Sequence, residues 1–207
     1  LDVTDAEACS AAFAAIERDL GPVDLAILNA GVWDQMIVSD FSAERAKRSM
    51  DVNYFGVLHA LEPAMRTFAG RGRGHIAFVS SVAGYRGLMK GAAYCPTKAA
   101  LNSLAEALYP HLTRKGVKLT LICPGYIKTP MTDVNTFPMP FIIPVEDAAK
   151  IMIAGLERGK YEIVFPWQMA IVMKTLRALP NWAFFGLINI AINRAGTGEA
   201  PPPGGGR

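Results

Sequence analysis

The sequence predicts an α/β fold in which a parallel sheet is covered by helices on both faces. Three observations support this prediction. Apolar runs of strand length recur along the chain, a helical pattern separates each run from the next, and glycine or proline marks the boundaries. Strands that alternate with helices in this way form parallel sheets, because each parallel connection must cross over a face of the sheet.

The first expected elements are an alanine-rich helix and the strand that follows it. Thr4 is the candidate N-cap of the helix, Glu7 completes a capping box three residues later, and Gly21-Pro22 ends the helix. The apolar run 23–28 then has strand length. Because it is apolar on both faces apart from Asp24, we expect a buried parallel strand.

The same alternation continues to the middle of the second half of the chain. The further expected elements are a helix over about 43–68, a strand over 76–79, a helix over 96–115, a strand over 117–122, a helix over about 145–158 and a strand over 161–165. Right-handed crossovers place the carboxyl ends of all these strands at one edge of the sheet. A ligand is expected at that edge.

Composition and charge are those of a globular domain. The 207 residues are 51% hydrophobic and 19% charged, which suits one substantial core. The net charge of +3 comes from scattered basic residues without neighbouring aromatic side chains, so nucleic acid is not an expected partner. Neither the three cysteines nor the three histidines have a disulfide or metal-ligand spacing. We therefore expect no metal and a reducing, cytoplasmic location.

The two ends of the chain differ from its middle. Leu1 begins the chain without a signal peptide, and we expect the middle and C-terminal part of a longer protein. One domain is expected over 1–194, followed by a disordered tail rich in glycine and proline over 195–207.

The apolar segment 167–192 needs separate treatment. Charged, proline and asparagine residues interrupt it, so a transmembrane helix is not expected. Three interpretations of the segment remain: an interfacial membrane helix, a cap over a substrate pocket, or a contact between copies of a homo-oligomer. A cap or an oligomer contact is the favoured interpretation, and a homo-oligomer is expected.

Tyr94 and Lys98 are the most informative pair of residues. They lie four residues apart at the start of a predicted helix, so their side chains project from the same face. A nearby ammonium and the positive end of the helix dipole are expected to lower the pKa of Tyr94, which would let it exchange a proton near neutral pH. A solvated surface pair is the alternative interpretation of this spacing alone.

Ser81 adds a second polar group at the predicted ligand edge. It follows the strand over 76–79, where its hydroxyl is placed to hydrogen-bond a substrate oxygen. The alternative is that Ser80-Ser81 only begins a glycine-containing loop.

Together these motifs resemble the short-chain dehydrogenase/reductase family over about residues 1–165. The matching motifs are Asn29-Ala30-Gly31, Asn53 within Asp51-Val52-Asn53-Tyr54, Ser81, Tyr94-x-x-x-Lys98 and Pro124-Gly125. The resemblance implies a Rossmann-like, doubly wound sheet and hydride transfer between NAD or NADP and an alcohol or carbonyl. Without a large C-terminal domain, the chain resembles the shorter dehydrogenase branch rather than the nucleotide-sugar epimerases and dehydratases.

The resemblance also implies a role for each catalytic residue. Tyr94 would exchange a proton with the reacting oxygen, and Ser81 would polarise and orient that oxygen. Lys98 would lower the pKa of Tyr94 and hold the nicotinamide ribose. Asn53 would hold a water that connects Lys98 to solvent, although it also reads as an ordinary amide on a helix surface.

Further residues are implied as cofactor contacts. The turn Asn29-Ala30-Gly31 would lie beside the adenosine ribose, or it is a simple strand-ending turn. After Pro124-Gly125, the backbone around Ile127 and the hydroxyl of Thr129 would hold the nicotinamide carboxamide. Asp2 would accept a hydrogen bond from the adenine amine, or it is a solvated carboxylate.

The chain departs from the family pattern at its start. The first strand, the glycine-rich turn that holds the pyrophosphate and the following helix are not among the 207 residues, so the first βαβ unit is absent. We expect this chain alone to be inactive and to expose a sheet edge, which would lower its solubility. The residue that distinguishes NAD from NADP is missing too. A truncated, non-catalytic binding protein is the alternative function.

The loop over 131–143 bears on the substrate. It is short and apolar, with Phe137, Met139 and Phe141. A nonpolar or bulky alcohol or carbonyl substrate is one interpretation, and a loop that only covers the core is the other.

Overall fold

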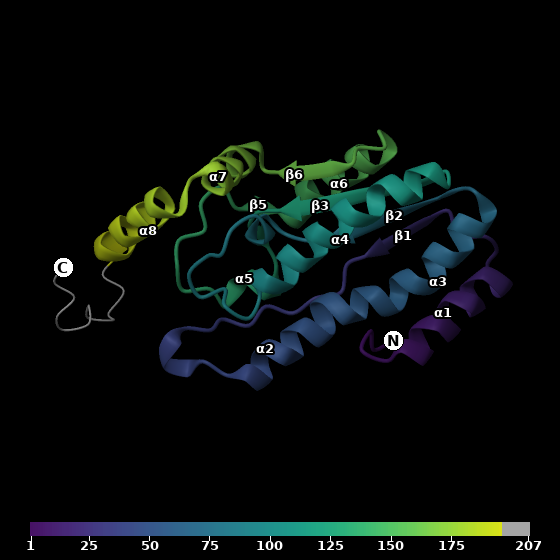
Figure 1. Cartoon of the computed structure of the whole chain (residues 1–207), viewed down its shortest axis with the longest axis horizontal. Coiled ribbons are helices and arrows are strands. Elements are labelled where there is room, and N and C mark those ends of the chain that lie inside the picture. The colour runs from purple at the N-terminus through teal and green to yellow at the C-terminus, as the bar shows by residue number, and fades with distance from the viewer. Residues whose placement is uncertain (196–207) are drawn as a thin grey trace.

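The computed structural model describes residues 1–195 (Figure 1). The expected disordered tail covers residues 195–207, and residues 196–207 of it lie outside the described residues. The helices are α1 (Ala6–Asp19), α2 (Ala43–Met50), α3 (Gly56–Arg71), α4 (Cys95–Arg114), α5 (Pro130–Asp133), α6 (Val145–Glu157), α7 (Trp167–Ala178) and α8 (Asn181–Ala195). The strands are β1 (Leu25–Leu28), β2 (Gly74–Val79), β3 (Val117–Pro124), β4 (Ile127–Lys128), β5 (Ile143–Pro144) and β6 (Glu162–Phe165).

The main sheet has four strands in the order β1-β2-β3-β6, and every neighbouring pair is parallel. Strands β4 and β5 form a separate parallel pair beyond the end of β3. The prediction of a parallel α/β sheet is therefore confirmed. Each crossover between the main strands contains at least one helix, as a parallel connection requires.

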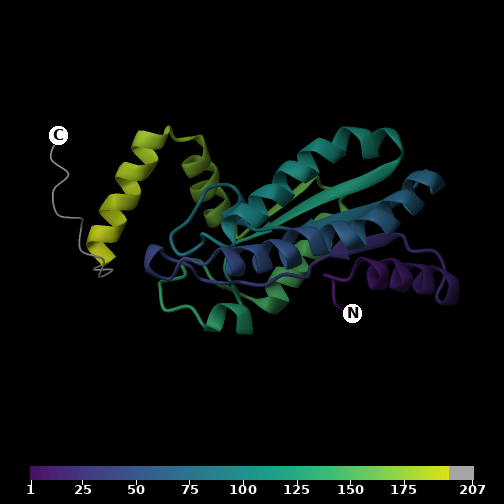
Figure 2. The same cartoon turned by 60° about the horizontal axis from the view of Figure 1, so that its bottom comes forward.

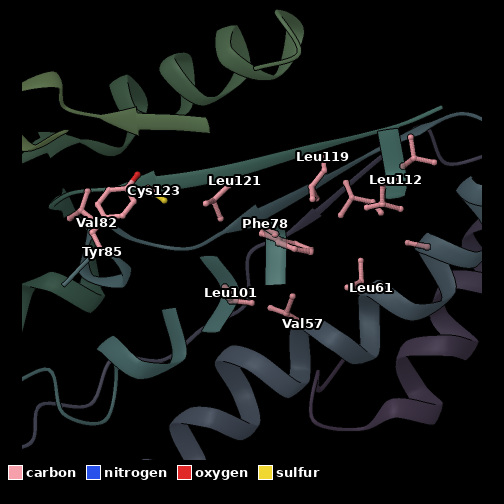
Figure 3. Packing of buried hydrophobic residues seen from close by; sticks show 14 of the residues in the cluster. Val57, Leu61, Phe78, Val82, Tyr85, Leu101, Leu112, Leu119, Leu121 and Cys123 are labelled. Carbon is pink, nitrogen blue, oxygen red and sulfur yellow. The ribbon is translucent and has the colours of Figure 1, made fainter. Parts of the chain in front are cut away.

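Two hydrophobic clusters cover the two faces of the sheet. On one face, Phe78 of β2 packs against side chains of α3 and α4, among them Val57 and Leu101 (Figure 3). On the other face, Ala77 of β2 packs with Ile163 of β6 and with α6. Neighbouring residues of one strand point to opposite faces, so β2 contributes to both cores.

The start of α1 differs from the prediction. Asp5, and not Thr4, is the N-cap, because its carboxylate accepts a 2.9 Å hydrogen bond from the backbone N–H of Ala8. Thr4 instead donates to the carboxylate of Asp2 from its backbone N–H at 2.9 Å and from its hydroxyl at 2.8 Å. The predicted capping box at Thr4 is wrong by one residue.

Strand β1 is also less buried than predicted. Leu25 and Ile27 are 40% and 45% exposed. The reason is their place in the sheet: β1 is an edge strand of the four described main strands and pairs only with β2. The sheet edge expected from the sequence is therefore present at β1.

The long helix predicted over 43–68 contains an irregularity. Residues Asp51–Phe55 form a π-helical turn between α2 and α3. Such a turn inserts one extra residue and changes the direction of the side chains it contains. Asn53, at its centre, is fully buried and points away from solvent.

The apolar segment 167–192 forms α7 and most of α8. Both helices lie at the end of the molecule beyond the carboxyl ends of the strands (Figures 1 and 2). Across residues 1–195, none of the helices has the length and the apolar character needed to cross a membrane.

Candidate active site

A cavity of about 1970 Å³ opens at the carboxyl ends of the main strands. The first residue after each of β1, β2 and β3 lines this cavity; these residues are Asn29, Ser80 and Gly125. Parallel strands place their carboxyl ends together, so residues far apart in the sequence reach one wall. The cavity lies at the sheet edge where a ligand was expected.

Tyr94 and Ser81 line the same cavity. Tyr94 is the N-cap of α4, and Ser81 caps the short 3-10 helix over 82–84. The Ser81 hydroxyl accepts a 3.1 Å hydrogen bond from the backbone N–H of Ala83 and donates to the carbonyl of Pro124 at 3.3 Å. Its position is therefore fixed from two sides.

Lys98 lies beneath Tyr94 on the first turn of α4. Its side chain is buried, its Nζ is 5.6 Å from the centre of the Tyr94 ring, and it donates a 2.8 Å hydrogen bond to the carbonyl of Val79. Burial lowers the pKa of Lys98 to about 8. The ammonium remains mostly charged at neutral pH.

The expected lowering of the Tyr94 pKa is not found in this structure. Burial raises the pKa of Tyr94 to about 12, and the neighbouring Ser81 hydroxyl opposes this shift only in part. The physical reason is that the Lys98 ammonium is directed at the Val79 carbonyl instead of the phenol oxygen. At neutral pH the Tyr94 hydroxyl is therefore protonated.

Asn53 connects the loop after β1 to α4. Its Oδ1 accepts a 2.6 Å hydrogen bond from the backbone N–H of Val32, and its Nδ2 donates to the Val32 carbonyl at 2.9 Å and to Thr97 Oγ1 at 3.2 Å. Both polar atoms of its side chain thus have protein partners. The alternative interpretation of Asn53 as a helix-surface amide is wrong, because the π-helical turn directs it inward.

Gly31 shows how closely the loop after β1 approaches these buried groups. A Cβ atom at this position would lie 3.3 Å from Asn53 Oδ1 and 3.6 Å from Lys98 Nζ. The first of these distances is shorter than an ordinary van der Waals contact, so a side chain here would press on Asn53. The adjacent Asn29 and Ala30 are exposed and line the cavity.

The segment after β3 forms the opposite wall. Pro124 is the buried last residue of β3, and Gly125, Ile127 and Thr129 line the cavity. A Cβ atom on Gly125 would lie 3.0 Å from the Met169 side chain, so this position also requires a small residue.

Asp2 is placed apart from the other candidate residues. It is exposed, it is not among the cavity-lining residues, and hydrogen bonds from Thr4 lower its pKa. In this structure its carboxylate accepts hydrogen bonds within its own turn.

The sequence interpretation missed Trp33, which stands at the cavity wall. Its ring meets the Tyr94 ring edge to face, with centroids 4.9 Å apart and an interplanar angle of 89°. Its indole N–H donates a 2.9 Å hydrogen bond to Asn135 Oδ1, which also accepts one of 3.0 Å from Gln35 Nε2. Trp33 directly follows the Asn29-Ala30-Gly31-Val32 stretch, and that adjacency was the only signal in the sequence.

Ser80 and Asn102 support the site from below. The buried Ser80 hydroxyl lies 3.1 Å from the carbonyl oxygen of Lys98 and donates a 2.6 Å hydrogen bond to Asn102 Oδ1. A Cβ atom on Gly84 would lie 2.7 Å from that same carbonyl oxygen. The loop after β2 is therefore packed directly onto the first turn of α4.

Comparison with known protein families agrees with this geometry. Residues 1–137 match the family model described as short chain dehydrogenase. The chain belongs to the short chain dehydrogenase family. The resemblance drawn from the sequence motifs and the doubly wound, Rossmann-like fold are thereby confirmed.

Relatives of known sequence are oxidoreductases by name. An uncharacterized oxidoreductase of Myxococcus xanthus is 39% identical over 184 residues, a match that covers 89% of this chain and 73% of that protein. An uncharacterized oxidoreductase of Mycobacterium tuberculosis is 30% identical over 168 residues, a match that covers 81% of this chain and 66% of that protein. The chain thus spans about two thirds to three quarters of these relatives.

Solved structures of the family have the same fold. A short chain dehydrogenase from Burkholderia cenocepacia, crystallised in complex with NADP, superposes with a TM-score of 0.75 at 26% identity over 95% of this chain and 77% of that one. A short chain dehydrogenase/reductase from Burkholderia phymatum, in complex with NAD, has a TM-score of 0.75 at 22% identity over 84% and 72% of the two chains.

Proposed function

We propose that this short-chain dehydrogenase transfers hydride between NAD or NADP and an apolar alcohol or carbonyl, with Tyr94 exchanging the proton. One observation carries the proposal. Tyr94 and Ser81 line one cavity, and the Lys98 ammonium lies 5.6 Å from the Tyr94 ring. An acid, a hydrogen-bond donor and a cation at one reacting oxygen are the groups that carbonyl reduction requires.

The residues that would hold the nicotinamide half of the cofactor are Lys98, the backbone at Ile127 and the Thr129 hydroxyl, and the turn 29–31 would lie beside the adenosine ribose. Bound there, the cofactor supplies or accepts the hydride. The absence of a side chain on Gly31 supports this assignment, because a Cβ would lie 3.6 Å from Lys98 Nζ and narrow the approach to it. The complexes of the two Burkholderia enzymes with NADP and NAD support either cofactor.

The proton step follows from the charge states of Tyr94 and Lys98. In reduction, the Tyr94 hydroxyl donates its proton to the substrate oxygen, while the Ser81 hydroxyl turns from the Pro124 carbonyl and donates a hydrogen bond to the same oxygen. A pKa of about 12 keeps that hydroxyl protonated and ready to donate at neutral pH. The phenolate that forms would be stabilised by the Lys98 ammonium once that group turns from the Val79 carbonyl toward the phenol oxygen, and in oxidation Tyr94 takes the proton back.

Asn53 acts in this proposal as a positioning residue. Its three hydrogen bonds hold Val32 and Thr97 in place, and Thr97 in turn donates a 2.7 Å hydrogen bond to the carbonyl of Tyr94. It therefore fixes the turn that approaches Lys98 and the first turn of α4 at the same time.

The cavity walls support an apolar substrate. The lining includes aromatic and sulfur-containing side chains from both halves of the chain, namely Trp33, Met36, Phe137, Met169 and Met173. Such walls are suited to shape-adaptable apolar groups. Phe137 of the loop over 131–143 lines the cavity, which supports a role of this loop in holding the substrate.

The decisive test is binding followed by turnover. NADH and NADPH fluorescence is titrated against this chain and against the chain preceded by whatever residues its gene encodes upstream, and then apolar aldehydes and ketones of increasing size are supplied. We expect the Tyr94→Phe variant to bind the cofactor as the wild type does and to lose at least about 100-fold in turnover. The prediction that the 207 residues alone are inactive is tested in the same experiment.

A non-catalytic binding protein is the alternative function. It would bind ligands in the cavity, and Tyr94→Phe would then change nothing beyond affinity. Absence of cofactor binding by either form of the chain would overturn the oxidoreductase proposal.

A further inference from the structure

Helix α8 carries an apolar stripe that lies toward the molecule: Phe184 is buried, and Ile188 and Ile192 line the cavity. Two further apolar residues of α8, Trp182 and Phe185, are three positions apart and are 80% and 56% exposed, and we call the surface that they form the outer face of α8. Large exposed apolar side chains that lie together mark a site of interaction.

Helix α7 also carries exposed apolar side chains. Trp167 is 68% exposed and Ile171, one turn later, is 59% exposed. These two residues are four positions apart and so share one face of the helix. Helices α7 and α8, which carry these exposed apolar residues, lie at the same end of the molecule (Figures 1 and 2).

The mouth of the cavity has an apolar rim of the same kind. Val38 and Phe41, in the loop before α2, are 86% and 66% exposed, and Met131 of α5 is 43% exposed. All three line the cavity. The loop before α2, α5 and α8 lie at the same end of the molecule in both views (Figures 1 and 2).

Helices α7 and α8 contain no acidic residue, and Lys174 and Arg177 are the basic residues of α7. The loop before α2 carries Asp34 and Asp40, which both pair with Arg45, and α5 carries Asp133. Lys174 and Arg177 pair with Glu162 and Glu106.

Two further cations lie at the cavity rim. The Arg86 guanidinium lies 4.3 Å from the centre of the Phe184 ring and donates to Asn181, and Lys90 lies 5.5 Å from the Phe137 ring. Neither has a carboxylate partner within residues 1–195. Their positive charges are therefore not neutralised by a carboxylate of the described residues.

We propose that the outer faces of α7 and α8, together with the cavity rim, dock on the surface of an anionic lipid bilayer. Exposed tryptophans, an amphipathic rim and unpaired cations are the features by which interfacial helices bind lipid headgroups. The docking itself is independent of the proposed enzymatic activity. If that activity holds, an apolar alcohol or carbonyl dissolved in the bilayer reaches the cavity through its apolar mouth without crossing water.

Vesicle flotation of the whole chain tests this docking. Vesicles of phosphatidylcholine alone are compared with vesicles that also contain phosphatidylglycerol, at low and high salt. We expect association with the anionic vesicles, weakened by salt, and at least about a tenfold weaker association for Phe185→Glu. The matched control is Ile153→Glu on α6, because Ile153 has the same 56% exposure and belongs neither to α7 and α8 nor to the cavity lining. It should bind as the wild type does.

A second measurement keeps the result independent of folding. Brominated lipids should quench the fluorescence of Trp167 and Trp182 but not that of Trp33, which lies in the cavity wall. The Trp167→Phe and Trp182→Phe variants separate the contributions of the three tryptophans. Absence of binding to anionic vesicles, or equal loss of binding in both glutamate variants, would overturn the proposal. So would a shift of Phe185→Glu from dimer to monomer in sedimentation without any lipid binding, because the face would then be a contact between two copies.

Discussion

The indole nitrogen of Trp33 donates a 2.9 Å hydrogen bond to Oδ1 of Asn135, a residue 102 positions later in the chain. This contact joins the loop after β1 to the loop that follows α5. Because the Trp33 ring also packs on the Tyr94 ring, the position of the second loop is transmitted to the candidate acid. The conformation of the loop over 131–143 and the geometry of the site are thereby coupled.

Replacement of Asn135 should release this loop. Asn135→Ala removes the acceptor for both Trp33 and Gln35, and we expect a loss of about 1–2 kcal/mol in the free energy of unfolding. Limited proteolysis should cut the loop faster, and Trp33 fluorescence should shift to the red in a chain that lacks Trp167 and Trp182. Asn135→Asp keeps the acceptor oxygen and should restore most of the wild-type behaviour. Equal cleavage rates for all three proteins would show that the contact does not hold the loop.

Addition of one methyl group at Gly31 should disturb the site more than the fold. Gly31→Ala places a Cβ 3.3 Å from Asn53 Oδ1 and 3.6 Å from Lys98 Nζ, so a loss of about 1 kcal/mol in stability is expected. Cofactor binding, measured by NADH or NADPH fluorescence, should weaken several-fold. Gly87→Ala is the matched control in the cavity wall, because a Cβ there meets nothing within 4 Å. Similar binding by both variants would argue against Gly31 as part of the cofactor approach.

Truncation of Asn53 should cost about 2–4 kcal/mol. The Asn53→Ala change leaves the partly buried N–H and carbonyl groups of Val32 without their partners and opens a small cavity at the buried Asn53 side chain. Urea-induced unfolding measures the change. Asn29→Ala, an exposed amide in the same loop, should change stability by less than about 0.5 kcal/mol. A small effect of Asn53→Ala would mean that the hydrogen bonds of the π-helical turn are replaced by water.

Lys98 should make folding stability depend on pH. Burial lowers its pKa from 10.5 to about 8, so between these pH values the unfolded chain binds the proton that the folded chain has lost. The free energy of unfolding of the wild type, relative to Lys98→Met, should therefore rise by about 3 kcal/mol as pH increases through this window. The comparison uses thermal or urea unfolding at several pH values. A difference between the two proteins that stays constant with pH would place Lys98 in a more solvated position.

Much of this protein could be predicted from local pattern. Apolar runs that alternate with helical periodicity gave the main-sheet strands to within about two residues, because buried parallel strands are apolar on both faces. Parallel strands with carboxyl ends at one edge then brought Ser81, Tyr94 and Gly125 to one cavity. The spacing of these residues along a strand and a helix was enough to predict that they lie at the same cavity.

Other features depended on contacts between distant segments. The hydrogen bond from Trp33 to Asn135 and the burial of Asn53 by the π-helical turn have no local signature. The Tyr94 pKa was wrongly expected to fall, because spacing places Lys98 on the correct face but does not show that its ammonium donates to the Val79 carbonyl.

The sequence by itself therefore determined the family, the parallel sheet and the positions of Ser81, Tyr94 and Lys98, because each follows from short-range periodicity and from motifs in a fixed order. Only the tertiary structure decided which side chains close the cavity, which face of α8 remains uncovered and what charge state burial imposes on Tyr94. Those properties are set by desolvation and by packing between segments that folding alone brings together.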